Sequence, residues 1–160
     1  MATPSPYRSL PATRRVALVA HVISASRQGR VHYVQRLVSR GGGFRAVTLM
    51  TWPVDRLARE VVRMNAESAE DELDLLQLLY VDLEPAIQTT FLDAAGVRHE
   101  DGKIAEELTP PFADGEAVQR AAAAVREAHG EDGERYLRTL VRYSPDAWPG
   151  IAMAAADRDM

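Results

Sequence analysis

The chain has 160 residues, of which 46% are hydrophobic and 26% charged; this fits one globular domain and excludes a disordered tail or a bare coiled coil. Cysteine is absent, which excludes disulfide scaffolds, cysteine-ligated metal sites and thiol enzymes. The net charge of −4 hides an asymmetry, because residues 1–66 carry a balance of +9 and residues 67–160 a balance of −13. Such an asymmetry favours association by complementary charge.

Arginine accounts for 18 of the 19 basic residues, and alanine is abundant. This bias is typical of a high-GC bacterial genome, so we expect a bacterial protein, and the arginine content by itself says little about function. No apolar run approaches the roughly 20 residues that cross a bilayer, so the sequence predicts no membrane role.

Helical spacing of apolar residues dominates the chain. In chain order, the predicted helices are 13–26, 30–40, 53–65, 69–95, 115–128 and 133–143. Residues 44–51 permit either a short strand or a turn of helix. Because helical segments far outnumber strand candidates, we predict an all-α fold, a compact bundle of five to seven helices. The predicted organisation is a flexible leader (1–12), a single helical domain (13–150) and a frayed tail (151–160).

The segment 69–95 is the longest predicted helix. Ser68-Ala69-Glu70-Asp71 resembles a capping box and marks its start. Pro85 removes a backbone donor and clashes with the preceding turn, so it predicts one Pro-kinked helix or two helices that abut there. Beyond this segment, Asp101-Gly102 predicts a short tight turn at 100–103. The last two helices predict a C-terminal αα-hairpin.

Motifs that carry chemistry are scarce. No histidine has the spacing that places metal ligands on one helix face, so neither a metal nor another cofactor is predicted. No nucleophile motif is present, so we assign no catalytic residue and favour a binding module over an enzyme. His99 beside Glu100 is a candidate site for a ligand or a proton. Adjacent residues of an extended arm point to opposite faces, which favours a structural role for the pair.

The charge asymmetry carries the functional hypothesis: a non-enzymatic protein-binding or regulatory module whose partner is another protein or a second copy. The predicted binding residues are Arg30, Arg36, Arg40 and Arg45. If these arginines instead pair with acids inside the monomer, they stabilise the fold. One alternative is a nucleic-acid-associated protein that binds through the arginine-rich helices of residues 14–45, although the chain as a whole is acidic. Another is a small-ligand binder or enzyme with a pocket near Trp52 or Tyr80.

The N-terminal region also bears on localisation. Thr13-Arg14-Arg15 before an apolar run, with Ser24-Ala25-Ser26 after it, superficially resembles a twin-arginine export leader. His21 interrupts the apolar run after five residues, and the next helix continues in register. We therefore expect a cytoplasmic protein, with export through such a leader as the alternative.

Overall fold

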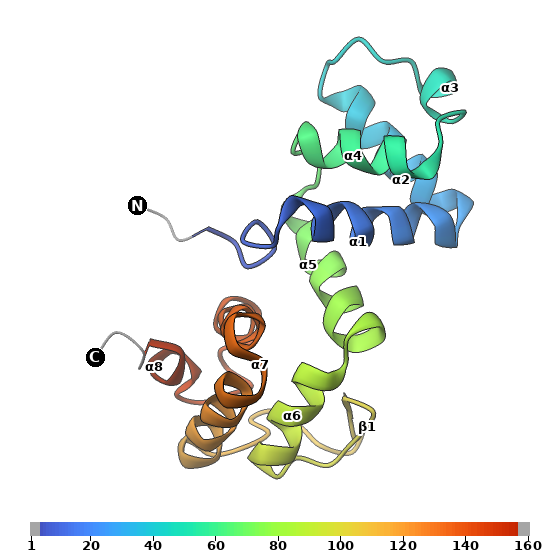
Figure 1. The fold of residues 1–160 in the computed structure, drawn as a ribbon. Coiled ribbons are helices and arrows are strands. Elements are labelled where there is room, and N and C mark those ends of the chain that lie inside the picture. The colour runs from blue at the N-terminus through green and yellow to red at the C-terminus, as the bar shows by residue number, and fades with distance from the viewer. Residues whose placement is uncertain (1–3, 157–160) are drawn as a thin grey trace. The chain divides into compact units, whose positions relative to one another are not determined.

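The computed structural model describes residues 4–156, and these residues are mostly helical. They contain eight α-helices, one π-helix and one two-stranded sheet, which confirms the predicted all-α class (Figure 1). The chain divides into two compact units, called here unit 1 (1–76) and unit 2 (77–160). The single domain over 13–150 and its packing as one bundle stay predictions.

Unit 1 is built on three helices that contact one another: α1, α2 and α4. The elements are α1 (Ala12–Ala25), α2 (Arg27–Ser39), α3 (Ala46–Leu49), α4 (Val54–Arg63) and most of α5 (Ala69–Gln77). Apolar side chains of all three fill the core: Leu18, Val19, Ile23, Tyr33, Val34, Leu37, Leu57, Ala58, Val61 and Val62. The stretch 44–51 forms the single turn α3, because the fully buried Leu49 gives it only one apolar anchor.

The predicted flexible leader is packed in its second half. Residues 6–9 form turns just before α1, and Tyr7 and Leu10 are buried. Residues 1–3 lie outside the described residues. Tyr7 and Leu10 therefore belong to the core of unit 1, whereas Ser9 of the same segment is exposed.

A tight corner joins α1 to α2. Ser26 is extended (φ −158°, ψ 156°), and its Oγ accepts a hydrogen bond of 2.9 Å from the Gly29 N–H, so Ser26 caps α2. Gly29 lies directly against α1, because a Cβ placed on it would be 2.4 Å from the carbonyl oxygen of Val22. Only glycine permits this approach of the two backbones.

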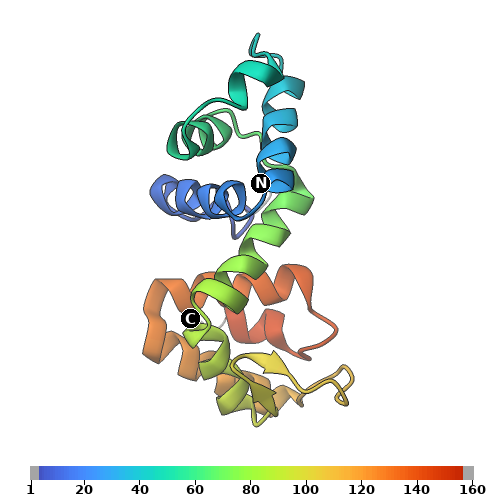
Figure 2. The same cartoon turned by 90° about the vertical axis from the view of Figure 1, so that its right-hand side faces the viewer.

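Unit 2 packs α7 against α6 and α8 (Figure 2). Its elements are the π-helix η1 (Leu78–Leu83), α6 (Ala86–Ala95), β1 (His99–Glu100), β2 (Lys103–Ile104), α7 (Gly115–Tyr143) and α8 (Ile151–Ala156). Aromatic rings fill its core. Phe91 makes edge-to-face contacts with Tyr136 and Trp148, with centroids 5.8 and 4.9 Å apart. Tyr80 of η1 contacts Tyr136 at 5.1 Å.

Residues 69–95, predicted as one Pro-kinked helix or two abutting helices, are divided among α5, η1 and α6. Glu84 leaves the helical conformation (φ −133°, ψ 67°), and Pro85 is the N-cap of α6. At the start of α5, the Asp71 N–H donates to Ser68 Oγ at 3.1 Å, and the Ser68 N–H donates to Asp71 Oδ2 at 2.9 Å. These reciprocal bonds form the capping box that the sequence indicates.

The turn at 100–103 closes a β-hairpin in which His99 pairs with Ile104 and Glu100 pairs with Lys103. The two turn residues, Asp101 and Gly102, have φ of 51° and 87°. Two consecutive positive φ values match the twist of the flanking strands, which is why Asp-Gly is favoured there.

Helix α7 consists of two helical segments separated at Gly130, whose backbone (φ 56°, ψ −127°) is not helical. Beyond it, Gly133 packs as Gly29 does: a Cβ would lie 2.6 Å from the Val125 carbonyl oxygen. Gly130 lies between the two helices of the predicted αα-hairpin, 115–128 and 133–143.

Residues 4–156 contain eight α-helices, one more than the upper limit of the prediction. The short helices α3 and α8 and the division of 69–95 into α5 and α6 raise the count, whereas α7 covers two predicted helices. Helix α8 lies in the predicted frayed tail, yet Ile151 and Ala154 are buried. Residues 157–160 of that tail lie outside the described residues.

Candidate functional site

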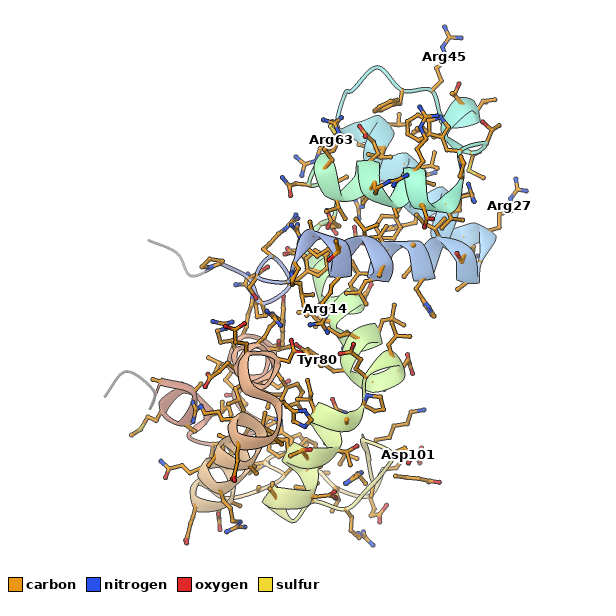
Figure 3. The ribbon with its side chains drawn as sticks, viewed as in Figure 1. Arg14, Arg27, Arg45, Arg63, Tyr80 and Asp101 are labelled. Atoms are coloured by element: carbon orange, nitrogen blue, oxygen red, sulfur yellow. The ribbon has the colours of Figure 1, made fainter. Side chains whose placement is uncertain are left out.

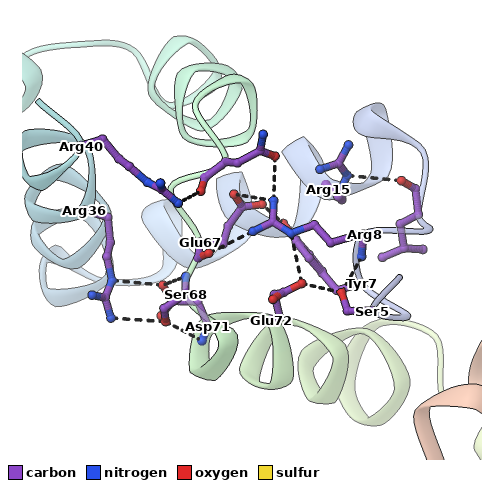
Figure 4. Close-up of polar contacts among 12 residues, drawn as sticks. Ser5, Tyr7, Arg8, Arg15, Arg36, Arg40, Glu67, Ser68, Asp71 and Glu72 are labelled. Atoms are coloured by element: carbon purple, nitrogen blue, oxygen red, sulfur yellow. Dashed lines mark hydrogen bonds and ion pairs between the residues drawn. The ribbon is translucent and has the colours of Figure 1, made fainter. Parts of the chain in front are cut away.

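Two buried glutamates of unit 1 are bonded to the N-terminal segment (Figure 4). The Tyr7 hydroxyl donates to Glu67 Oε2 at 2.5 Å, and Ser5 Oγ donates to Glu72 Oε1 at 2.5 Å. Arg8 contacts both carboxylates, at 3.5 Å from Glu67 and 3.1 Å from Glu72. Burial, and then the bond to Glu67, raise the pKa of Tyr7 above its ordinary value, so the phenol remains a donor. This cluster places one guanidinium and two hydroxyl groups on the two buried carboxylates and ties the N-terminal segment to the start of α5.

A second cluster surrounds Asp71, whose side chain is 5% exposed. His32 Nε2 hydrogen-bonds Asp71 Oδ1 at 2.6 Å, and Arg36 Nε donates to Asp71 Oδ2 at 3.2 Å. Burial alone would raise the pKa of Asp71, but the hydrogen bonds from the Ser68 N–H and from His32 outweigh it and lower that pKa. Asp71 therefore remains ionised and connects α2 to α5.

Two of the predicted binding arginines make contacts inside unit 1. Arg36 is held by Asp71, as just described, and Arg30 Nη1 donates to the carbonyls of Met50 and Trp52 at 3.3 and 2.9 Å. Both guanidinium groups are partly buried by these contacts. Their role in partner binding stays a prediction, and the structure gives each a role in holding unit 1 together.

The other two predicted arginines are exposed. Arg40 donates a hydrogen bond to the backbone carbonyl of Asn65. Arg45 precedes α3 and points away from the ribbon (Figure 3), and it has no hydrogen bond or ion pair within residues 4–156. Of the four, Arg45 offers its guanidinium most freely to a partner.

Helix α4 adds arginines that the sequence analysis did not select. Arg56, Arg59 and Arg63 lie on its exposed face, opposite its buried residues. Their spacing of three and seven residues is the signal that could have revealed them. The Arg56 guanidinium lies 3.8 Å from the ring centre of Trp52, and the Arg63 guanidinium lowers the pKa of Glu60 through a hydrogen bond.

The exposed charges of the two units are opposite in sign. Unit 1 exposes six arginines: Arg27, Arg40, Arg45, Arg56, Arg59 and Arg63. It exposes only three carboxylates: Asp55, Glu70 and Asp74. The described part of unit 2 exposes twelve carboxylates against five basic side chains. The unit 1 surface is therefore cationic even though the whole chain carries −4.

The predicted His99–Glu100 site lies on the β-hairpin of unit 2. His99 Nε2 hydrogen-bonds Asp93 Oδ1 at 2.6 Å, and His99 Nδ1 accepts from the Gly102 N–H at 3.0 Å. Both ring nitrogens are thus used within the unit, whereas Glu100 is exposed. This bonding pattern fixes the hairpin on α6, and a role in binding a ligand or proton stays a prediction.

Two of the pockets formed by the described residues lie in unit 2. One, of about 750 Å³, is lined by hairpin residues within 98–107. The other, of about 570 Å³, lies beside Pro85 at the start of α6 and includes His129, whose Nε2 bonds Thr90 Oγ1 at 2.9 Å. Neither of these pockets is lined by Trp52 or Tyr80.

Among the described residues, no three or more His, Asp and Glu side chains are grouped to hold a metal ion. Within residues 4–156, no helix combines the length and apolar character that spanning a bilayer requires. Comparisons with models of known protein families, with curated proteins and with solved structures found no significant match to this chain.

Proposed function

We propose that this protein is a non-enzymatic protein-binding module, and that the exposed arginines of unit 1 hold an acidic surface of a protein partner. The observation that carries the proposal is that unit 1 buries acidic side chains and exposes arginines. Glu67, Asp71 and Glu72 are buried against basic and hydroxyl groups, whereas six arginines face solvent. An exposed excess of one sign speeds association with a partner of the opposite sign.

The side chains around Trp52 support a protein partner. Trp52 is half-buried, stacks under Arg56 and makes an edge contact with Phe44 at 5.4 Å. Tryptophan and arginine are enriched among the residues that carry binding energy in protein interfaces. The stack also restricts Arg56, so less conformational entropy is lost when it binds.

Nucleic-acid binding through residues 14–45 is the competing proposal. Within that range Arg30 and Arg36 bond inside unit 1, and Arg15 donates to the Leu10 carbonyl at 3.2 Å. Fewer guanidinium groups are therefore open to phosphates than the sequence indicates. The net charge of −4 repels a nucleic acid and an acidic protein alike at long range, so it does not separate the two partners. The internal bonds of Arg15, Arg30 and Arg36 and the Trp52–Arg56 stack outside residues 14–45 favour the protein partner. A cytoplasmic or exported location stays a prediction.

The test measures binding of the immobilised full chain to poly-L-glutamate, which mimics an acidic protein surface, and to random duplex DNA. Replacing two exposed arginines together, Arg45→Glu with Arg59→Glu, should weaken polyglutamate binding about tenfold or more at low salt, mainly through slower association. The matched control is Arg138→Glu with Arg142→Glu, two exposed arginines of unit 2. The control should bind as wild type does.

Salt dependence separates the alternatives. Polyglutamate binding should weaken as salt rises from about 20 mM to about 150 mM, because the Debye length shrinks to about 8 Å. No polyglutamate binding at low salt, or an equal loss in the control, would contradict the proposal. Tighter binding to DNA than to polyglutamate, with a steep salt dependence, would favour the nucleic-acid alternative.

A further inference from the structure

Helix α3 displays the most exposed large hydrophobic side chain of the described residues, Val47, at 81% exposure. Arg45, just before the helix, is also exposed and points outward (Figure 3). The buried Leu49 anchors the turn, and Arg30 donates to two backbone carbonyls directly after it. Arg45 and Val47, called the α3 corner from here on, therefore stand on a fixed support.

The pocket of about 750 Å³ on the β-hairpin, called the hairpin pocket from here on, has complementary chemistry. Its lining includes the carboxylates of Glu100, Asp101 and Glu106 and the apolar side chains of Ile104 and Ala105. These three carboxylates make no ion pair within residues 4–156. The lining also contains Lys103 and the Arg98–Glu107 ion pair, so its four carboxylates exceed its two cationic side chains. The pocket thus combines an excess of negative charge with an apolar patch.

The hairpin is held in place before any partner arrives. His99 bonds Asp93 of α6 at 2.6 Å and accepts from the Gly102 N–H at 3.0 Å. The Gln88 side chain, also on α6, donates to the Gly102 carbonyl. A preformed pocket loses little conformational entropy on binding.

We propose that the acidic partner is a second copy of this protein, and that the α3 corner of one copy docks in the hairpin pocket of another. The inference rests on the proposed function, because it names the partner of the same arginine surface. Arg45 meets the pocket's carboxylates, and Val47 meets Ile104 and Ala105. Charge and polarity are each complementary between the two surfaces.

The charge distribution favours a second copy over an unrelated acidic protein. Each copy carries both surfaces, a cationic unit 1 and an anionic unit 2, so two copies supply each other's opposite sign. One turn of helix in one pocket is smaller than a standard interface, so we expect weak association, with a dissociation constant on the order of 100 µM at low salt. Because the two surfaces differ, the contact closes a reciprocal pair or extends into a chain.

Sedimentation equilibrium of the full chain tests the proposal. Wild type should associate between about 10 µM and about 1 mM at low salt, and should dissociate at about 0.5 M salt. A corner variant, Arg45→Gln with Val47→Ser, and a pocket variant, Glu100→Gln with Glu106→Gln, should each remain monomeric. An equimolar mixture should form only 1:1 pairs, because one variant keeps the pocket and the other keeps the corner.

The matched control neutralises two exposed side chains of α7, Arg138→Gln with Glu127→Gln, and should associate as wild type does. Circular dichroism of every variant excludes misfolding as the cause of a change. A monomeric wild type at about 1 mM and low salt, association that survives in either variant, or a mixture that stays monomeric would overturn the proposal. Polyglutamate binding separates the two proposals: a monomer that binds polyglutamate contradicts this inference and leaves the proposed function standing.

Discussion

Unit 1 and unit 2 each turn the chain through a helix–helix corner in which a glycine lies against a valine carbonyl of the preceding helical segment. In unit 1, a Cβ on Gly29 would lie 2.4 Å from the carbonyl oxygen of Val22. In unit 2, a Cβ on Gly133 would lie 2.6 Å from that of Val125. Close backbone packing has therefore imposed the same residue type twice.

The bends themselves differ. Ser26 makes the bend of unit 1 with an extended backbone that many residues can adopt, and its hydroxyl caps α2. Gly130 makes the bend of unit 2 with a positive φ of 56°. Both corners therefore require the contact glycine, whereas the residue that makes the bend depends on the local backbone conformation.

The largest effect is expected for Gly29→Ala. The new methyl group meets a backbone oxygen that cannot rotate away, so α1 and α2 must separate, at a cost of about 3 kcal/mol of unfolding free energy. The chain has one tryptophan in each unit, Trp52 and Trp148. Urea unfolding, monitored by ¹⁹F NMR of protein labelled with 5-fluorotryptophan, should show a lower unfolding midpoint at Trp52. The control Gly115→Ala should be neutral, because its Cβ meets nothing closer than 3.8 Å.

Gly133→Ala should lower the free energy of unfolding nearly as much as Gly29→Ala does, by about 3 kcal/mol. The new methyl group again meets a backbone oxygen. Here the midpoint reported by Trp148 should shift. Equal stability of wild type and variant would show that the corner of unit 2 can open without cost, and the likeness of the two corners would fail.

Gly130→Ala tests the difference between the bends. An alanine at φ 56° and ψ −127° is strained, so the unfolding free energy should fall by about 2 kcal/mol. The Trp148 signal should report this loss. A variant as stable as wild type would mean that this bend, like that of unit 1, accepts an ordinary residue.

Lowering the pH should destabilise unit 1 through protonation of Asp71. Because folding lowers its pKa, ionised Asp71 stabilises unit 1 above the unfolded pKa of about 4, and that contribution disappears as pH falls through the lowered folded value. Asp71→Asn should therefore cost about 2 kcal/mol at neutral pH and progressively less below pH 4. Urea unfolding at several pH values, read at Trp52, measures this convergence.

Asp74 is the matched control on the same helix. Burial, and then the charges of Glu70 and Asp71, raise the pKa of Asp74, so its ionised form opposes folding at neutral pH. Asp74→Asn should leave stability unchanged or raise it. A loss in both variants would contradict the electrostatic explanation.

The smallest effect is expected for Ser26→Ala, which removes the N-cap of α2. The free energy of unfolding reported by Trp52 should fall by about 1 kcal/mol. Ser26→Gly should cost only a few tenths of a kcal/mol, because glycine is a good N-cap. If Ser26→Ala costs as much as Gly29→Ala, the bend and the contact cannot be separated in unit 1.

Local features of the fold were predictable from sequence because they depend on neighbouring residues. The capping box of Ser68 and Asp71 and the Asp-Gly turn each need only a few adjacent positions. The same sequence left α3 undecided between a short strand and a turn of helix, because one turn with a single buried residue has no periodicity. It also did not reveal that the contact glycines are required, since that depends on how closely two helices approach.

The candidate site was less predictable because it depends on long-range pairing. His32 meets Asp71 across 39 residues of sequence, and Arg30 meets carbonyls about 20 residues away. No spacing rule shows which arginines are used in such contacts. The exposed face of α4 was different, because Arg56, Arg59 and Arg63 follow helical spacing that could have been recognised.

The bonds between the N-terminal segment and the start of α5 have a consequence for synthesis of the chain. Tyr7 and Glu67 are separated by 60 residues, and Ser5 and Glu72 by 67. On the ribosome, Tyr7 emerges long before its acceptor exists. Contacts of such wide sequence separation form late and slow folding. A nascent chain that ends before Glu72 therefore lacks the bonds that close unit 1, and its N-terminal segment remains open to proteases and chaperones until that residue leaves the exit tunnel.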